Sequence, residues 1–279
     1  MNAADPQATR ELPIGVFDSG VGGLTVVRAL MERLPFENIV YFGDTARVPY
    51  GIKSVPTIES FTGQITDFLL AHRVKLLIIA CNTMAAVARH VVDEKAARYG
   101  ITVLDVIDAG AKEAARVSPS GHIGVIGTPT TVNSNAYARR IHALRPAARV
   151  FSQACPLFVP LVEEGWLDHP VTRLTAQEYL KPVLAEHIDT LVLGCTHYPL
   201  LKPLIRNVIS EAGETVRLVD SAITVAEDAA TTLAASGLAN SGQGAATTHC
   251  YVTDVPLRFQ TIGERFLGRA LGSVEKAEF

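Results

Sequence analysis

DTLVLGCTHYP, residues 189–199, is the stretch around which the fold is organised: a short apolar run stops at a glycine and is followed by a cysteine. Strands buried inside a parallel sheet have such continuous apolar runs, because helices cover both faces of the sheet. The carboxyl ends of these strands are where open α/β sheets place their ligands. Cys195, Thr196 and His197, which follow the run, are therefore candidates for a functional site.

The same pattern occurs earlier in the chain. Residues 75–80, KLLIIA, lead into Cys81, Asn82 and Thr83. A single cysteine at a strand end is more often a small buried side chain than a catalyst, but two in equivalent settings favour a functional pair. A thiol has an ordinary pKa of about 8.5, so it can give and take protons once its surroundings adjust it. We therefore expect one thiol on each side of a substrate.

The composition indicates a globular protein and argues against several classes of partner. The chain has 279 residues, of which 48% are hydrophobic and 19% charged, enough to bury a core. The net charge is −3 and the basic residues are scattered, so no nucleic-acid partner is expected. No stretch resembles a signal peptide or a membrane span, which predicts a cytoplasmic protein without a membrane partner.

The four cysteines form no CxxC pair, which argues against a zinc site and fits a reducing compartment. Cys155 and Cys250 have no polar motif beside them and are predicted to be structural. A metal site built from Cys81, Cys195 and His197 would lack a fourth ligand at recognisable spacing. We therefore predict free thiols and no metal.

Strands and helices are predicted to alternate along the chain. Apolar runs indicate strands at residues 14–17, 39–42, 75–80, 101–107, 123–126, 150–152, 190–193, 216–219 and 248–252. Helices are predicted between them, among others at residues 55–71, 84–99, 221–235 and 256–267. This alternation indicates an α/β protein with mainly parallel sheet. Because the two cysteine units fall in different halves, we expect two similar doubly wound domains with the active site in the cleft between them.

A glycine-rich turn, DSGVGG at residues 18–23, follows the first predicted strand and opens a helix. Its backbone N–H groups could bind an anion. Thr25 stands where a GxGxxG motif needs its last glycine, so a dinucleotide site is not favoured.

Other interpretations of these residues are open. Asp18 and Ser19 could simply cap the helix after the turn, and Asn82 and Thr83 could cap the helix predicted from Met84. A single-thiol hydrolase would need a base such as His197 beside Cys195. That mechanism leaves the Cys81 unit unexplained.

Five motifs together identify a family. They are DSGVGGL at 18–24, YFGD at 41–44 with PYG at 49–51, CNT at 81–83, GT at 127–128 and GCTHYP at 194–199. In this order, from about residue 14 to residue 221, they resemble glutamate racemase. The resemblance implies a cofactor-independent interconversion of L- and D-glutamate that supplies D-glutamate for peptidoglycan synthesis, carried out by a homodimer.

The resemblance also implies a domain division. Residues 12–107 and 221–279 would form the first α/β domain, and residues 108–220 the second. Residues 1–11 would be a disordered tail.

The resemblance assigns roles to the site residues. Racemisation needs a base on one face of Cα and an acid on the other. By resemblance, Cys81 deprotonates D-glutamate and Cys195 deprotonates L-glutamate. Asp18 and His197 would be the partners that tune Cys81 and Cys195, and Glu163 is a further candidate near Cys195. The implied substrate-binding residues are Asp18, Ser19, Tyr50, Gly51, Asn82, Thr83, Thr128, Thr131, Thr196 and His197.

Two functional alternatives stay open. Racemases of other amino acids, such as aspartate, share the two-thiol plan, and the sequence does not display pocket length. Some members of the family bind DNA gyrase, so a gyrase-binding protein with weak activity is the second alternative.

Some relatives also need a peptidoglycan-precursor activator and carry an N-terminal extension. The short polar start of this chain predicts activity without an activator.

Overall fold

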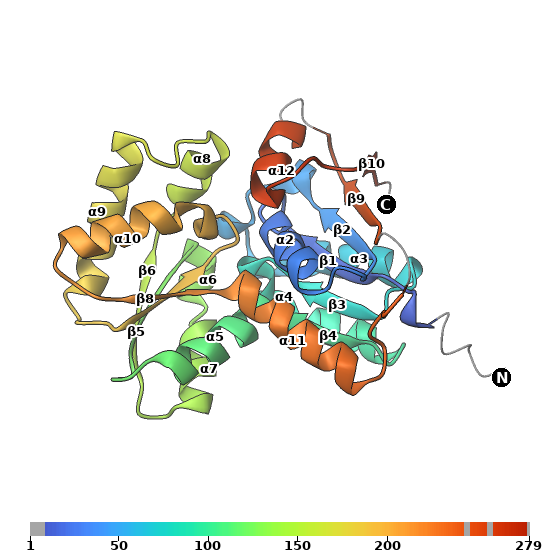
Figure 1. Ribbon diagram of the computed structural model, residues 1–279, viewed down its shortest axis with the longest axis horizontal. Coiled ribbons are helices and arrows are strands. Elements are labelled where there is room, and N and C mark those ends of the chain that lie inside the picture. Colours follow the sequence, from blue (N-terminus) through green and yellow to red (C-terminus); the bar gives the residue numbers. More distant parts are fainter. Residues whose placement is uncertain (1–8, 243–245, 256–258, 278–279) are drawn as a thin grey trace.

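The computed structural model describes residues 9–242, 246–255 and 259–277, and contains two parallel sheets. The six-stranded sheet has, in spatial order, β10 (Val274–Lys276), β9 (Thr248–Val252), β2 (Ile39–Gly43), β1 (Ile14–Asp18), β3 (Leu76–Ile79) and β4 (Thr102–Asp105). The four-stranded sheet has β6 (Arg149–Ala154), β5 (His122–Gly127), β7 (Thr190–Gly194) and β8 (Arg217–Asp220). The two sheets lie in separate parts of the molecule (Figure 1).

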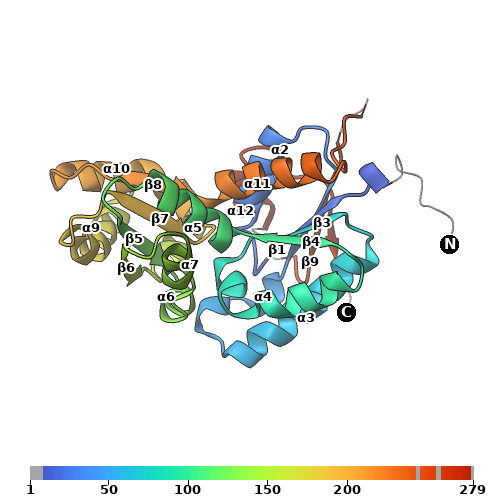
Figure 2. The same cartoon turned by 90° about the horizontal axis from the view of Figure 1, so that it is seen from below.

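Helices cover both faces of each sheet, as the continuous apolar strands predict. On the six-stranded sheet, α2 (Leu24–Arg33), α11 (Ser221–Ala235) and α12 (Phe259–Leu267) cover one face, and α3 (Val55–Ala71) and α4 (Asn82–Ala97) cover the other (Figure 2). On the four-stranded sheet, α5 (Val106–Val117) and α7 (Ala136–Leu144) cover one face, and α8 (Phe158–Glu163), α9 (Pro170–Leu184) and α10 (Lys202–Glu211) cover the other. Both units are therefore doubly wound, as expected.

Successive strand residues face opposite layers, which explains why the strands are apolar at every position. Val16 packs with the layer of α2 and α11, whereas Phe17 packs with the layer of α3 and α4. The register aligns Phe17 with Phe42 and with Ile79. The carboxyl ends of β1 and β3 therefore meet at one edge, where Asp18 and Cys81 follow.

The chain passes between the sheets twice, from β4 into α5 and from β8 into α11. Strands of the six-stranded sheet lie within residues 14–105 and 248–276, and strands of the four-stranded sheet within residues 122–220. We propose the predicted division, residues 12–107 with 221–279 and residues 108–220, as the two domains. Helices α5 and α11 begin within two residues of these boundaries, which supports it.

The predicted end of one strand and the predicted start of one helix were wrong, and both corrections matter for the site. The predicted strand 101–107 ends at Asp105, because the Asp105 carboxylate accepts hydrogen bonds from the backbone N–H groups of Ile107 and Asp108 and caps α5. The helix predicted from residue 84 begins at Asn82, with Cys81 at its N-cap position and no side-chain cap. Asn82 is therefore not a capping residue.

The helix after the glycine-rich turn begins at Leu24, with Gly23 as its N-cap residue and no side-chain cap. The capping interpretation of Asp18 is therefore wrong, because Asp18 ends a strand several residues earlier. Strand β10 was not predicted, because its three residues carry no apolar run.

Several predictions fall partly outside the described residues. These are residues 1–8 of the predicted tail, residues 256–258 of the last predicted helix, and residues 243–245 and 278–279 of the first predicted domain. Arg10, within the predicted tail, is described and donates from Nε to the carbonyl of Gly237 at 3.0 Å. Within the described part of the chain, no helix has the length and apolar character needed to span a membrane.

Candidate active site

The first half of the site lies at the carboxyl edge of the six-stranded sheet. Cys81 follows β3, is only 5% exposed, and its thiol donates to Ser19 Oγ at 3.6 Å. Asp18 ends β1 and its Oδ2 accepts from the backbone N–H of Gly20 at 3.0 Å. The glycine-rich turn therefore folds back over the carboxylate and places Ser19 against the thiol.

Electrostatics keep the Cys81 thiol protonated in the substrate-free protein. Burial, and then the nearby Asp18 charge, raise the pKa of Cys81 to about 12, although the backbone N–H of Met84 and the hydrogen bond with Ser19 lower it. Burial also raises the pKa of Asp18, an effect that the charge of His197 opposes. Cys81 thus stands as a proton donor at neutral pH.

The second half of the site is a chain of three side chains at the end of β7. The Cys195 sulfur lies 3.8 Å from His197 Nδ1, and His197 Nε2 lies 2.9 Å from Oε1 of Glu163, at the end of α8. Burial lowers the pKa of His197, but hydrogen bonds with Cys195 and Glu163 raise it, to about 10. A protonated imidazole can therefore donate to both neighbours at neutral pH. The edge of Phe266 from α12 packs against this ring.

Direct contacts join the two halves. Thr196 Oγ1 donates to Asp18 Oδ1 at 3.5 Å, and Thr25 Oγ1 from α2 donates to the carbonyl of Thr196 at 3.1 Å. A Cβ on Gly22 would lie 2.2 Å from Thr196 Oγ1 and 2.7 Å from His197 Nδ1, so only glycine fits there. Electrostatic interaction with Cys195 is the smallest of the causes that raise the pKa of Cys81. The two thiols therefore interact electrostatically across the junction.

Threonine hydroxyls form a second connection between the halves. Thr83 Oγ1, in the first turn of α4, lies 3.0 Å from Thr128 Oγ1, which lies 3.0 Å from Thr131 Oγ1. Thr130 Oγ1 donates to the carbonyl of Gly51 at 2.8 Å. The predicted binding residues Thr83, Gly51, Thr128 and Thr131 thus come together from both sheets.

Two more of the predicted binding residues, Tyr50 and Asn82, are held by side chains that the sequence did not single out. The Tyr50 hydroxyl donates to the buried carboxylate of Asp44, which also pairs with Arg47 at 2.7 Å. Asn82 Oδ1 accepts a hydrogen bond of 2.7 Å from the hydroxyl of Tyr137. Asp44 lies in the YFGD motif, a signal that could have found it, whereas no sequence pattern indicates Tyr137.

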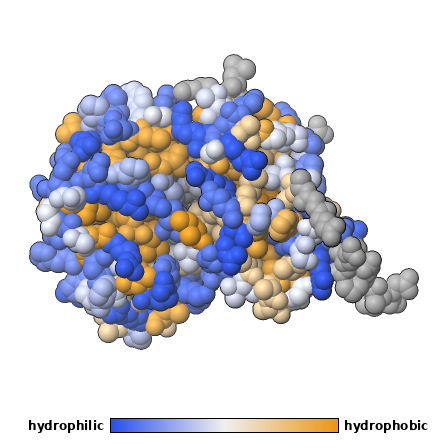
Figure 3. All heavy atoms as spheres, in the orientation of Figure 1, coloured by the Kyte–Doolittle hydropathy of each residue, from blue (hydrophilic) through white to orange (hydrophobic). Residues whose placement is uncertain are grey.

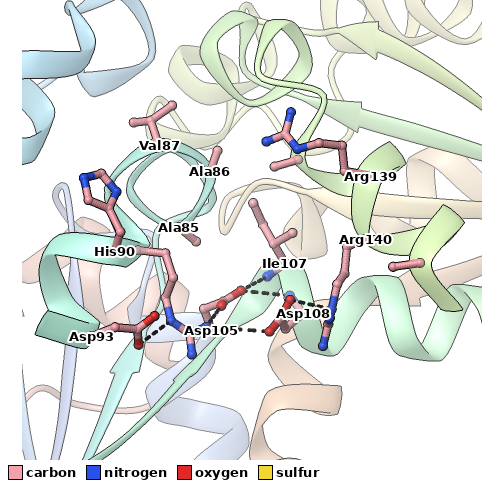
Figure 4. A pocket seen from close by; sticks show the side chains of 13 residues that line it. Ala85, Ala86, Val87, His90, Asp93, Asp105, Ile107, Asp108, Arg139 and Arg140 are labelled. Atoms are coloured by element: carbon pink, nitrogen blue, oxygen red, sulfur yellow. Dashed lines mark hydrogen bonds and ion pairs between the residues drawn. The ribbon is translucent and has the colours of Figure 1, made fainter. Parts of the chain in front are cut away.

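A cavity of about 520 Å³ lies between α4, α5 and α7, and neither thiol is part of its lining (Figure 4). Its charged groups pair within its own wall: Arg89 Nε with Asp93 at 2.8 Å, and Arg140 Nε with Asp108 at 2.8 Å. Arg89 also binds the Asp105 carboxylate, the group that caps α5. The pairs with Asp105 and Asp108 connect α4 and α7 to the start of α5, where the chain passes between the sheets.

All four cysteines are free and buried, but their surroundings differ. Cys155 donates its thiol to the carbonyl of Gln153, and burial raises its pKa. Burial alone raises the pKa of Cys250 to about 11. Across the described ranges no three His, Cys, Asp or Glu side chains are grouped as a metal site would require.

Iodoacetamide is expected to alkylate Cys195 before Cys81 at pH 7. An imidazolium lies against the Cys195 sulfur, whereas Cys81 faces a carboxylate and has its pKa raised to about 12. Because the thiolate is the nucleophile, alkylation of Cys81 should accelerate about tenfold per pH unit between pH 7 and 10. Peptide mass spectrometry over time measures both rates, with the buried Cys250 as the slow internal reference. Faster alkylation of Cys81 at pH 7 would contradict this assignment of charges.

In sequence and in fold, this chain is similar to known racemases. The family model described as Asp/Glu/Hydantoin racemase matches residues 14–229, and the chain belongs to this family.

Within the family, the similar proteins are glutamate racemases. The glutamate racemase of Syntrophus aciditrophicus strain SB is 67% identical over 266 residues, which cover 95% of this chain and 96% of that protein. The glutamate racemase of Neisseria meningitidis strain Z2491 is 63% identical over the same shares. The crystal structure of the Francisella tularensis glutamate racemase in complex with D-glutamate is 42% identical, with a TM-score of 0.90, and the match covers 96% of this chain and 98% of that one. The predicted resemblance to glutamate racemase is confirmed.

Proposed function

We propose that this chain interconverts L- and D-glutamate by a two-thiol mechanism without a cofactor, and so supplies D-glutamate for peptidoglycan synthesis. The observation that carries the proposal is the pair Cys81 and Cys195, delivered by different sheets and joined through the contact between Asp18 and Thr196. The names of the similar proteins support glutamate as the substrate.

In the L-to-D direction, the Cys195 sulfur removes the α-proton from one face of L-glutamate, so the C–H bond breaks and its electron pair stays on Cα. The Cys81 thiol then gives its proton to the opposite face and forms the new C–H bond. The raised pKa of Cys81 supports this role, because the group is a thiol at neutral pH. The D-to-L direction uses the same steps in reverse. His197, paired with Glu163, holds a proton beside Cys195.

The α-proton of an amino acid is a weak acid, so the site must stabilise negative charge that develops on Cα and its carboxylate. The first turn of α4 presents backbone N–H groups beside Cys81, and helix N-termini favour anions. We propose that Ser19, Asn82 and Thr83 hold the α-carboxylate and ammonium from this side. Tyr50, Gly51, Thr128, Thr131 and Thr196 would complete the substrate-binding set.

The test is incubation of the purified protein with L-glutamate in D₂O, without added cofactor. Loss of optical rotation together with deuterium at Cα is expected. Turnover of L-aspartate but not L-glutamate would keep the mechanism and change the substrate. No exchange with either amino acid would reject the enzymatic proposal and favour the gyrase-binding alternative.

We predict full activity without a peptidoglycan-precursor activator. The measurement compares initial rates with and without a UDP-linked muropeptide. Turnover that depends on the added muropeptide would contradict this prediction.

The oligomeric state and the cellular location stay predictions. A homodimer is supported by apolar side chains exposed within residues 157–174, namely Leu157, Trp166, Val171 and Leu174. Hydrophobic and hydrophilic residues are mixed over the side of the molecule that carries α8 and α9 (Figure 3). Light scattering after size-exclusion chromatography measures the mass in solution, and a monomer at micromolar concentration would contradict the dimer. The predicted cytoplasmic location and the absence of nucleic-acid and membrane partners need separate tests.

A further inference from the structure

Tyr137 lies where the two sheets are connected. Its side chain belongs to α7, over the four-stranded sheet, and is 2% exposed. Its hydroxyl lies 2.7 Å from Asn82 Oδ1, 3.1 Å from Ser221 Oγ and 3.4 Å from the carbonyl oxygen of Val106. These three partners are the first residues of α4, α11 and α5. One phenol thus contacts both chain crossings and the residue that follows Cys81.

The direction of these hydrogen bonds follows from the number of protons. A phenol has a single proton to donate, and burial raises the pKa of Tyr137, so the proton stays on the oxygen. Two of its neighbouring oxygens can only accept a hydrogen bond: Asn82 Oδ1 and the carbonyl oxygen of Val106. Asn82 Oδ1 is the nearer of the two. The Ser221 hydroxyl therefore donates to Tyr137, and Tyr137 donates to Asn82 Oδ1. This chain holds the amide carbonyl against Tyr137 and turns the NH₂ group of Asn82 the other way.

The ring of Tyr137 also packs against the strand that carries the other thiol. A Cβ on Gly194, the residue before Cys195, would lie 3.1 Å from Cε2 of Tyr137. A Cβ on Gly110 would lie 2.4 Å from Ser221 Oγ and 3.2 Å from the Tyr137 hydroxyl. Glycine at positions 110 and 194 leaves room for the Tyr137 ring and its hydrogen bonds. Tyr137 therefore contacts the elements that deliver both thiols.

A small cavity places Asn82 near the second thiol, Cys195. It has a volume of about 10 Å³, close to the size that holds one water, and its lining includes Asn82, Cys195, Thr196 and Ser221. Asn82 thus follows Cys81 in the chain and shares a cavity wall with Cys195. The orientation of its amide decides whether the NH₂ group or the carbonyl oxygen lies on the side away from Tyr137.

We propose that Tyr137 is a positioning residue for racemisation, whose hydroxyl holds the Asn82 amide so that its NH₂ group donates to the substrate carboxylate. The proposal rests on the function proposed above. Without the phenol hydroxyl, the amide can rotate and present its carbonyl oxygen to the carboxylate, which repels it. In this proposal Tyr137 contacts neither the substrate nor the two sulfur atoms. It therefore affects the affinity for substrate and not the proton-transfer steps.

The test is Tyr137→Phe, which keeps the ring and removes the hydroxyl. KM for glutamate should rise about tenfold, the effect of losing one hydrogen bond to a charged group, while kcat changes by less than about threefold. Ser221→Ala is the matched control, because it removes the upstream donor and leaves the bond between Tyr137 and Asn82. Its KM should stay within about twofold of the wild-type value.

A double-mutant cycle separates positioning from a structural role. In an Asn82→Ala background, Tyr137→Phe should leave KM unchanged, because no amide remains to be oriented. Melting temperatures of all variants are measured alongside. A lower melting temperature for Tyr137→Phe with KM unchanged, or an equal rise in KM in both backgrounds, would overturn the proposal.

Calorimetric titration with glutamate keeps this test independent of turnover. If the wild-type protein binds glutamate without racemising it, the proposed function fails, and the positioning proposal is still decided by the roughly tenfold affinity loss expected in Tyr137→Phe. If the wild-type protein neither binds nor turns over glutamate, both proposals are overturned.

Discussion

Cys81→Ala and Cys195→Ala are each expected to lower the rate of racemisation by about 10³-fold in both directions, because every turnover needs a base on one face of Cα and an acid on the other. The hydrogen-bonded neighbours of the two thiols are poor replacements for them. Ser19 beside Cys81 is a hydroxyl, and His197 beside Cys195 is already engaged by Glu163. Optical rotation of L- and D-glutamate solutions measures both directions.

Cys250→Ala is the matched control, because Cys250 is equally small and buried but lies in β9, outside the site. It should keep its activity within about twofold. A variant lacking Cys81 or Cys195 that retains more than about a tenth of the wild-type rate would contradict the two-thiol mechanism.

Isotope exchange in these variants should assign each thiol to one face of the substrate. In Cys81→Ala, Cys195 can still remove the α-proton of L-glutamate and return a deuteron to the same face. Slow deuterium incorporation into L-glutamate without inversion is therefore expected in D₂O, followed by NMR, and D-glutamate should remain unlabelled. Cys195→Ala should show the opposite preference. Labelling of the other enantiomer would reverse the assignment of the faces.

Gly22→Ala is expected to reduce activity by about 10²-fold, because the added methyl group would lie 2.2 Å from Thr196 Oγ1 and 2.7 Å from the His197 ring. Neither neighbour can retreat easily. Thr196 is held by Thr25, and His197 is held between Glu163 and Phe266. The substitution should push the second half of the site away from Asp18. It should also lower the free energy of unfolding by about 1–3 kcal/mol, as overpacking of a buried contact does.

Gly63→Ala is the control for Gly22→Ala. Gly63 lies inside α3, and its added Cβ would meet only the flexible Lys95 and Val91 side chains, at 3.3 and 3.4 Å. Alanine in a helix interior should stabilise the protein by up to about 1 kcal/mol and leave activity unchanged. Steady-state kinetics and urea unfolding measure both variants. Unchanged activity in Gly22→Ala would show that the two halves of the site do not depend on this close approach.

Much of the site could be predicted because its signals are local. The apolar runs before Cys81 and Cys195 indicate buried strands, and parallel strands bring their carboxyl ends to one edge. The pairing of His197 with Cys195 needs a separation of only two residues. The alternative interpretation of Asp18 and Asn82 as capping residues was wrong, because the two helices have Gly23 and Cys81 at their N-cap positions and no side-chain cap.

The sequence by itself determined the alternation of strands and helices, the two thiols at strand ends and the family to which the chain belongs. Only the tertiary structure decided which distant residues complete the site: Thr196 lies 178 residues from Asp18, and Tyr137 lies 55 residues from Asn82. Periodicity and capping depend on neighbours within a few positions of the chain, so they are visible in a sequence. A hydrogen bond between residues of different sheets depends on how those sheets pack, and that is settled only when the whole core has formed.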